Sequence, residues 1–278
     1  MRINNNIMAL TAYRNVTLRY QMMMKSMERL STGLRINRAA DDPAGFAISE
    51  RMRAQIRGLK QASRNAQDAI SMLQVGEGAL HETTAILHRI RELTVQAANG
   101  TKSESELEAI QFEIDQLIQE IDRIAKDTNF NTIVLFTPKE ETEPDSEANS
   151  NVFKIHIGAN AGQNMEISFS DMSAQALGIK AINVLDNPDQ AMAIVDQALN
   201  KVSSERAKLG AYQTRLEHTI NNLDQTAINL QAAESRIRDV DIAEEMMNFT
   251  KNRILLQVAI AMLAQANVAP QMVLQLLG

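Results

Sequence analysis

The 278-residue sequence contains no cysteine, no tryptophan, 5 prolines, 11 glycines and only 4% aromatic residues. Without cysteine, the chain cannot form a disulfide framework, a thiolate zinc site or a cysteine nucleophile. Proline and glycine both fall below their usual shares of about 5% and 7%, and helix interiors exclude both residues. The composition therefore favours long helices and argues against a β-sandwich, a collagen or a disordered chain.

Long hydrophobic runs are also absent. No apolar stretch reaches the roughly 18 residues that a membrane-spanning helix needs, so we expect no membrane insertion. Arg14 and Arg19 interrupt the region where a signal peptide would place its apolar segment. We therefore expect that, if the protein leaves the cell, it does so without a cleaved signal peptide.

The charge is unevenly placed along the chain. The formal net charge is −6, yet residues 1–65 hold 12 basic and 4 acidic side chains, a local charge of +8. A basic arm can bind nucleic acid, but Arg53, Arg57, Lys60 and Arg64 follow a helical spacing typical of a solvated stripe or a seam for acidic helices. Because no RNA-binding aromatic motif accompanies them, we expect no nucleic-acid partner.

Two long stretches without proline, 44–137 and 189–269, show heptad periodicity. In the first stretch, the positions that face a neighbouring helix are all apolar or small: Leu59, Ala62, Ala66, Ala69, Leu73, Gly76, Leu80, Thr83, Leu87, Ile90, Thr94 and Ala97. In the second, one column repeats every seven residues: Val195, Val202, Leu209, Leu216, Leu223, Leu230 and Ile237. The pattern predicts a mainly α fold, a long antiparallel helical bundle or coiled-coil rod.

The remaining local signals complete this prediction. Asn99-Gly100 is typical of a turn, and Ser103 with Glu106 forms a capping-box pattern at the start of a further helix. Residues 138–151 are acidic and contain proline, which predicts a solvated loop. Residues 152–170 contain two alternating segments, which predict a small β-hairpin.

No catalytic or metal-binding motif is complete. His81-Glu82 begins the zinc-peptidase motif H-E-x-x-H, but Ala85 occupies the position of the second histidine. Gly76-Glu77-Gly78 begins a phosphate-binding pattern, but it lies inside a heptad run and not after a strand. We therefore predict that the protein is not an enzyme and that it binds no metal and no cofactor.

Both chain ends follow a 3,4 hydrophobic repeat. At the N-terminal end the repeat consists of Tyr13, Val16, Tyr20, Met23, Met27, Leu30 and Leu34. At the C-terminal end it consists of Ile242, Met246, Phe249, Arg253, Leu256, Ile260 and Leu263. Two interpretations fit the pattern: the two helices bury each other within one molecule, or they present an association site to other molecules.

The two ends of the chain also resemble a known family. The N-terminal motifs are MRINNNIMAL, KSMERLSTGLRINRAADDPAGFAISERMRAQIRGLKQASRNAQDAISMLQVGEGAL and RIRELTVQAANGT, and the C-terminal ones are SSERAKLGAYQTRLEHTINNL, ESRIRDVDIAEEM, NFTKNRILLQ, AMLAQAN and QMVLQLLG. NFNTIVLF and KIHIGANAGQNMEISF follow the same family's pattern in the middle of the chain. In order and over about two-thirds of the chain, these motifs resemble bacterial flagellin.

The resemblance implies a subunit that self-assembles into the extracellular flagellar filament for swimming motility. Residues 1–44 and 236–278 are then the two parts of a core coiled-coil domain. Residues 45–185 and 186–235 are the two parts of an inner rod domain, and the outer domains of larger flagellins are missing. The hook–filament junction protein, which shares weaker versions of the terminal motifs, is the alternative.

The resemblance also implies partners. These are other copies of the chain, hook-associated and cap proteins, an export chaperone on the C-terminal helix at residues 246–277, and a host Toll-like receptor. Export would occur unfolded through the flagellar channel. The residues expected at polymerisation contacts are Tyr13, Tyr20, Met27, Leu30, Leu34, Met246, Phe249, Leu256, Ile260 and Leu263.

One family site can be carried over to individual residues. In flagellins, the receptor contacts an arginine and a leucine of the L-Q-R-x-R-E-L motif and a glutamate on the next helix. The matching residues are Arg89, Leu93 and Glu113. His88 stands where the family motif has glutamine.

Three departures from the family pattern bear on assembly. Residues 11–24 are richer in methionine and tyrosine, apolar residues occupy 256, 258 and 260, and Gly278 replaces a terminal arginine. These changes predict an unusually apolar filament core. The other two function classes are a flagellin-related peptidase, against which the incomplete H-E-x-x-H motif argues, and a nucleic-acid-binding coiled coil, which rests only on the basic N-terminal arm.

Overall fold

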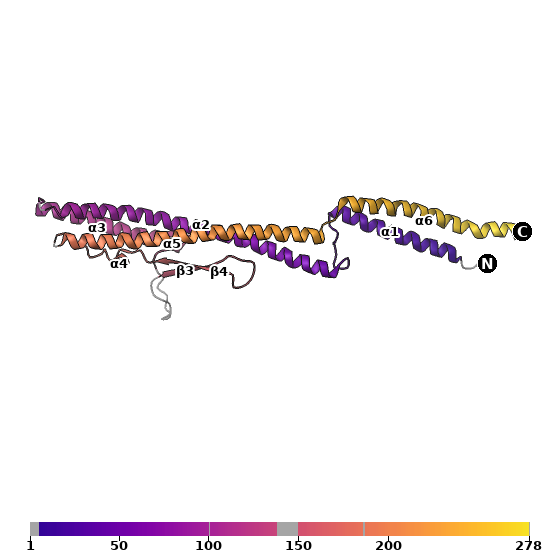
Figure 1. Cartoon of the computed structure of the whole chain (residues 1–278), viewed down its shortest axis with the longest axis horizontal. Coiled ribbons are helices and arrows are strands. Elements are labelled where there is room, and N and C mark those ends of the chain that lie inside the picture. The colour runs from indigo at the N-terminus through magenta and orange to yellow at the C-terminus, as the bar shows by residue number, and fades with distance from the viewer. Residues whose placement is uncertain (1–5, 100, 138–149, 186, 278) are drawn as a thin grey trace. The chain divides into compact units, whose positions relative to one another are not determined.

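The computed structural model describes residues 6–99, 101–137, 150–185 and 187–277. Its helices are α1 (Ile7–Thr32), α2 (Pro43–Ala97), α3 (Glu104–Asp127), α4 (Ala174–Leu177), α5 (Pro188–Arg238) and α6 (Ile242–Leu277). Its strands are β1 (Asn129–Phe130), β2 (Ile133–Val134), β3 (Ser150–His156) and β4 (Asn164–Ser170). Figure 1 labels most of these elements.

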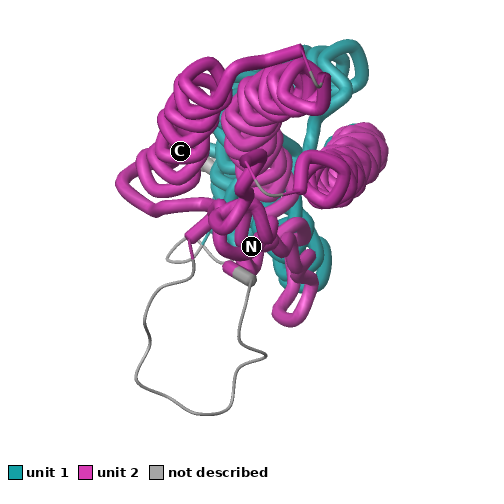
Figure 2. Tube along the Cα trace, turned by 90° about the vertical axis from the view of Figure 1, so that its left-hand side faces the viewer, with its two compact units in different colours: residues 1–56, 228–278 teal, residues 57–227 magenta. Residues whose placement is uncertain are grey.

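The chain forms two compact units, which Figure 2 distinguishes by colour. Unit 1 contains residues 1–56 and 228–278, and unit 2 contains residues 57–227. Helices α2 and α5 each begin in one unit and end in the other. The predicted domain boundaries at 44/45 and 235/236 stay predictions.

Unit 2 is an antiparallel helical bundle. Arg91 Nε of α2 lies 2.7 Å from Asp196 Oδ1 of α5, and Arg206 Nη2 of α5 lies 3.7 Å from Glu77 Oε1 of α2. The later residue of α2 thus pairs with the earlier residue of α5, which shows that the two helices run in opposite directions. Helix α3 starts with the predicted capping box, in which the Glu106 carboxylate accepts a hydrogen bond of 2.9 Å from the Ser103 N–H. This hydrogen bond stabilises the charged carboxylate and so lowers the pKa of Glu106.

The predicted heptad positions form the core of this bundle. All twelve heptad positions predicted for the first long stretch, which begin with Leu59 and end with Ala97, are buried. The first five residues of the seven-residue repeat in α5, from Val195 to Leu223, are buried as well. Glu205 occupies a polar position between them and is also buried, because its carboxylate accepts the Ser170 N–H at 3.1 Å and the Ser170 hydroxyl at 2.9 Å. The predicted mainly α antiparallel bundle is confirmed.

Strands β3 and β4 form the predicted hairpin, with His156 paired to Asn164 and Ser150 paired to Ser170. Strand β3 begins two residues before the predicted start, and residues 138–149 of the predicted acidic loop lie outside the described residues. On β4, Met165, Ile167 and Phe169 face the core, as the alternation predicts. The short pair β1–β2 and the short helix α4 were not predicted.

Gly76 of α2 provides the space in which aromatic side chains of the hairpin region pack against this helix. A Cβ at this position would lie 2.9 Å from Phe169 Cε1 and 3.5 Å from Phe136 Cζ. The Phe136 and Phe169 rings meet edge to face with centroids 5.8 Å apart, and Phe153 makes a similar contact with Phe169 at 5.6 Å. The glycine therefore lets the aromatic cluster of the hairpin region pack directly against α2.

Candidate assembly surface

Helices α1 and α6 lie side by side and antiparallel in unit 1 (Figure 1). At one end, Asn6 Nδ2 donates a hydrogen bond of 2.8 Å to the Ala266 carbonyl. At the other end, Arg29 Nη1 lies 3.4 Å from Glu245 Oε2. The two chain ends therefore form one helical pair.

The seam between these helices is shallow. Its α1 positions follow a regular 3,4 spacing: Ala9, Ala12, Val16, Arg19, Met23, Ser26 and Leu30. Its α6 positions follow the same spacing: Glu245, Phe249, Asn252, Leu256, Ala259, Leu263 and Ala266. Among the described side chains of α1 and α6, only Ser26 and Glu245 are buried, and the hydrophobic seam residues are half-buried. Two helices alone therefore leave the apolar surface only partly covered.

The structure divides the expected polymerisation residues into two groups. Half-buried residues at the seam or beside it are Leu30, Leu34, Phe249, Leu256 and Leu263. Exposed residues are Tyr13, Tyr20, Met27, Met246 and Ile260, with Tyr13 63% exposed. Burial within one molecule therefore accounts for the first group, whereas the second group is left exposed and its role in association stays a prediction.

Further exposed hydrophobic residues of the helical pair lie outside the set expected at polymerisation contacts. They are Ile7, Met8, Leu10, Leu18, Met22, Met24, Ile242, Met247, Ile254, Val258, Met262 and Val268. The available signal was the absence of charged residues from residues 3–13 and 254–278. None of the helices, within the part of the chain that the structure describes, is long and apolar enough to cross a membrane.

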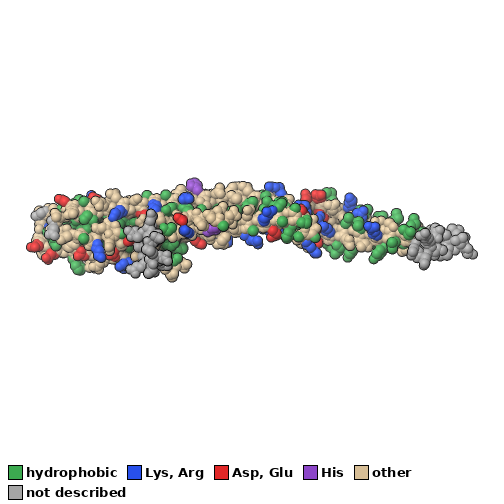
Figure 3. Space-filling view, turned by 90° about the horizontal axis from the view of Figure 1, so that it is seen from below, with side chains coloured by type: hydrophobic (Ala, Val, Ile, Leu, Met, Phe, Trp, Pro, Cys, Tyr) green, Lys and Arg blue, Asp and Glu red, His purple; other side chains and the backbone are tan. Residues whose placement is uncertain are grey.

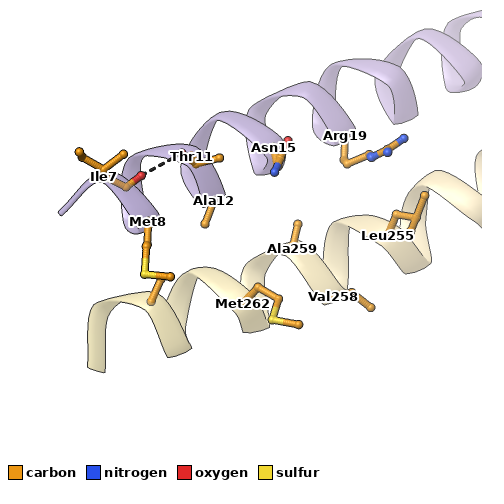
Figure 4. A pocket seen from close by; sticks show the side chains of 11 residues that line it. Ile7, Met8, Thr11, Ala12, Asn15, Arg19, Leu255, Val258, Ala259 and Met262 are labelled. Carbon is orange, nitrogen blue, oxygen red and sulfur yellow. Dashed lines mark hydrogen bonds between the residues drawn. The ribbon is translucent and has the colours of Figure 1, made fainter. Parts of the chain in front are cut away.

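A groove of about 570 Å³ runs between the outer parts of the two helices (Figure 4). Met8 and Ala12 of α1 point toward α6, and Ala259 points back toward α1. The remaining lining residues include Arg19, Leu255, Val258 and Met262. Because small alanines meet at this part of the seam, the helices leave a hollow there, which is lined by apolar side chains and by the polar side chains of Thr11, Asn15 and Arg19.

The segment that follows α1 folds back along this helix. Gly33 ends α1 with a φ of 72°, a conformation that favours glycine. The Asp41 carboxylate lies 2.7 Å from Lys25 Nζ and accepts the N–H groups of Asn37 and Arg38. The hydrogen bond from Lys25, followed by those backbone N–H groups, holds the pKa of Asp41 below its usual value.

A charged cluster joins the neighbouring helix ends within unit 1. Arg238 Nη1 lies 2.6 Å from Glu50 Oε1, and the Arg238 guanidinium lies 5.5 Å from the centre of the Phe46 ring. Arg53 Nε lies 2.9 Å from Glu234 Oε1. Together with the bridge between Leu34 and Asp239, these contacts hold the segment that follows α1 and the segment that leads into α6.

The structure brings two of the three expected receptor residues together on the surface. Arg89 of α2 pairs with Glu113 of α3 through Nη2 at 2.8 Å and Nε at 3.1 Å to Oε1. The Glu113 carboxylate is the main cause that raises the pKa of Arg89. Leu93 is only 1% exposed and lies in the core one helical turn from Arg89.

Comparison with known proteins decides the family. A family model for the bacterial flagellin N-terminal helical region matches residues 3–140, and one for the C-terminal helical region matches residues 192–277. The chain belongs to the bacterial flagellin family. A flagellin of Bacillus subtilis is 51% identical over the full length of both chains, and one of Halalkalibacterium halodurans is 50% identical, also over both full lengths.

A third relative is a flagellar filament 31.3 kDa core protein of Treponema maltophilum, which is 47% identical over the full length of both chains. Flagellins are structural subunits that polymerise into the extracellular flagellar filament, and they are not enzymes. The predicted family, the structural function and the absence of enzymatic activity are therefore confirmed, whereas nothing favours the hook–filament junction alternative.

Proposed function

We propose that this flagellin assembles into the filament through the exposed faces of α1 and α6. The observation that carries the proposal is the large number of hydrophobic side chains that the helical pair leaves exposed, including Tyr13, Tyr20 and Ile260. Burial of apolar surface stabilises contacts by roughly 25 cal/mol per Å². Repeated helix seams with neighbouring copies therefore hold a polymer without covalent links.

Deletion of residues 240–278 tests this proposal. The deletion removes α6 and leaves α1 without its partner, so we expect soluble subunits under conditions in which the full chain polymerises. Electron microscopy and sedimentation measure the result, with the full chain as the control. Filaments formed by the truncated chain would show that the assembly surface lies elsewhere.

We also propose the domain division that the family resemblance implies. Residues 1–44 and 236–278 form the core domain, and residues 45–185 and 186–235 form the inner rod domain. The concentration of buried hydrophobic residues between Ile56 and Ala227 supports a separately stable inner part. Limited proteolysis of free subunits should therefore yield a resistant fragment that starts near residue 45 and ends near residue 235.

For the host Toll-like receptor, we propose that the surface pair Arg89 and Glu113 makes the contact and that Leu93 supports this pair from the core. Arg89→Ala and Glu113→Ala should each weaken binding to the receptor ectodomain. Arg91→Ala is the matched control, because Arg91 is on the same helix but pairs with Asp196 of α5. Equal loss of binding in Arg91→Ala would point to a different contact surface.

For export, we propose that a chaperone covers residues 246–277 and that the unfolded chain passes through the flagellar channel without a cleaved signal peptide. The exposed residues Met246, Met247 and Met262 support a cover on α6 before assembly. Deletion of residues 246–277 should abolish chaperone binding in titration calorimetry.

The export route has a separate test. N-terminal sequencing of filament protein should show that no leader peptide has been removed. Hook-associated and cap proteins are the partners we propose for the two filament ends.

A further inference from the structure

Basic and acidic residues occupy different parts of the helical pair of unit 1. Its outer part, residues 7–24 and 246–269, carries four cations and no acidic residue: Arg14, Arg19, Lys251 and Arg253. We call these four residues the basic zone. On the face shown in Figure 3, blue and green side chains, and no red ones, are visible near the grey chain ends.

The basic zone lacks acidic partners within the described part of the chain. Arg14, Lys251 and Arg253 are exposed and form no ion pair there, and Arg19 forms no ion pair either but donates a hydrogen bond to the Met22 sulfur at 3.8 Å. The pairing of Asn6 with Ala266 and of Arg29 with Glu245 places Arg19 at about the same level as Arg253. Copies that packed side by side without an axial shift would bring these like charges together, which destabilises an interface.

The start of α6 carries the opposite charge. Asp239, Asp241 and Glu244 are exposed. Asp239 accepts the Ser235 hydroxyl, and Asp241 accepts the N–H groups of Ala243 and Glu244. Glu244 forms no ion pair with any residue that the structure describes, so its carboxylate is available to another molecule.

We propose that neighbouring copies assemble with an axial shift that places Glu244 of one copy against the basic zone of the next. Arg253 lies nine positions after Glu244, which corresponds to about 14 Å along a helix. The contact joins two different patches, so it is heterologous, and a heterologous contact that does not close produces an open filament. This inference rests on the proposed assembly through α1 and α6.

Continuity with the apolar surface favours the start of α6 over the acidic residues of unit 2 as the partner patch. Ile242, Met246 and Met247, which border Glu244, are exposed hydrophobic residues. The same interface can therefore bury apolar surface and pair opposite charges. Charge pairs of this kind set register and exclude unshifted packing more than they add affinity.

Charge reversal tests the contact. Glu244→Lys and Arg253→Glu should each raise the critical concentration for polymerisation about fivefold to tenfold, because an attractive pair becomes a repulsive one. An equal mixture of the two variants should polymerise close to the unmodified protein, since alternating copies restore every opposite-charge contact. The double variant should do the same. Glu108→Lys and Arg215→Glu make the same charge changes at exposed sites of unit 2 and should change the critical concentration less than twofold.

The possible outcomes separate the alternatives. Rescue by the mixture supports the contact between copies, whereas rescue by the double variant alone would overturn it in favour of a contact within one copy. A defect in Arg253→Glu with normal assembly of Glu244→Lys would also overturn it, because the acidic partner would then lie elsewhere. If both single variants polymerise normally while the 240–278 deletion does not, the charge inference fails and the assembly proposal remains.

Discussion

The two units differ in where their hydrophobic side chains lie. Unit 2 contains nearly all of the buried ones, whereas Ile36 and Ile56 are the only buried hydrophobic residues of unit 1 among those that the structure describes. Most of the exposed large hydrophobic residues lie in unit 1. The same heptad chemistry therefore makes a complete core where three helices and a hairpin meet, and an incomplete one where two helices meet.

The largest difference between the units should appear in truncations of single side chains. Leu87→Ala in unit 2 removes a side chain with 0% exposure, so the free energy of unfolding should fall by about 2–5 kcal/mol. Leu10→Ala in unit 1, where Leu10 is 73% exposed, should change it by less than about 0.5 kcal/mol. Urea unfolding of free subunits measures both values. Similar losses from both variants would erase the contrast between the units.

The second prediction concerns the dense packing of unit 2. Gly76→Val places atoms where a Cβ already lies 2.9 Å from Phe169, so it should cost about 1–3 kcal/mol of folding stability. Gly78→Ala is the matched control on the same helix, because a Cβ there meets nothing within 4 Å. It should stabilise the subunit by about 0.5–1 kcal/mol through helix propensity. Thermal unfolding by circular dichroism distinguishes the two signs.

The third prediction concerns the assembly surface of unit 1. Ile260 is 51% exposed, so Ile260→Gln should leave the unfolding of the free subunit nearly unchanged. In the filament, loss of apolar burial should lower the stability of each subunit by about 1–2 kcal/mol and lower the depolymerisation temperature. An unchanged depolymerisation temperature would count against burial of Ile260 between copies and against an unusually apolar filament core.

The smallest effect should be a pH dependence of the segment after α1. The pKa of Asp41 is lowered in the folded state, chiefly by Lys25. The ionised Asp41 carboxylate therefore contributes its full stabilisation when the pH is above the unfolded-state pKa of about 3.9. This stabilisation is lost as the pH falls from that value through the lower pKa of Asp41 in the folded state. The protection of the Asn37 and Arg38 amides, relative to the intrinsic exchange rate at each pH, should therefore decrease as the pH falls through this window, by an amount that reflects about 0.2–1 kcal/mol. In Asp41→Asn, exchange should be faster at neutral pH and should lack this acid dependence.

The sequence predicted unit 2 better than unit 1 for a physical reason. From Leu59 to Ala97 the apolar and small residues mark one buried column, because the neighbouring helices cover that column fully. In α1, by contrast, the seam passes through Arg19 and Ser26, which a search for hydrophobic repeats passes over. Tyr13, Tyr20 and Met27 supplied the regular hydrophobic spacing instead, yet they lie outside the seam.

Other features depended on contacts that no local pattern contains. The role of Gly76 becomes clear only when Phe169 from the hairpin is placed against α2. The strands β1 and β2 are two residues long and are joined by Asn131 and Thr132 with positive φ values, so they lack the alternation that identifies longer strands. The burial of Leu93, one helical turn from Arg89, likewise follows from bundle geometry and not from the motif.

The most direct test of incomplete cover in unit 1 is hydrogen exchange measured by mass spectrometry on free subunits and on assembled filaments. We predict that amides of α1 and α6 exchange rapidly in free subunits and become strongly protected in filaments, while amides near Leu87 are protected in both states. Strong and equal protection of α1 and α6 in the two states would contradict the account, because the helical pair would then be complete without other copies.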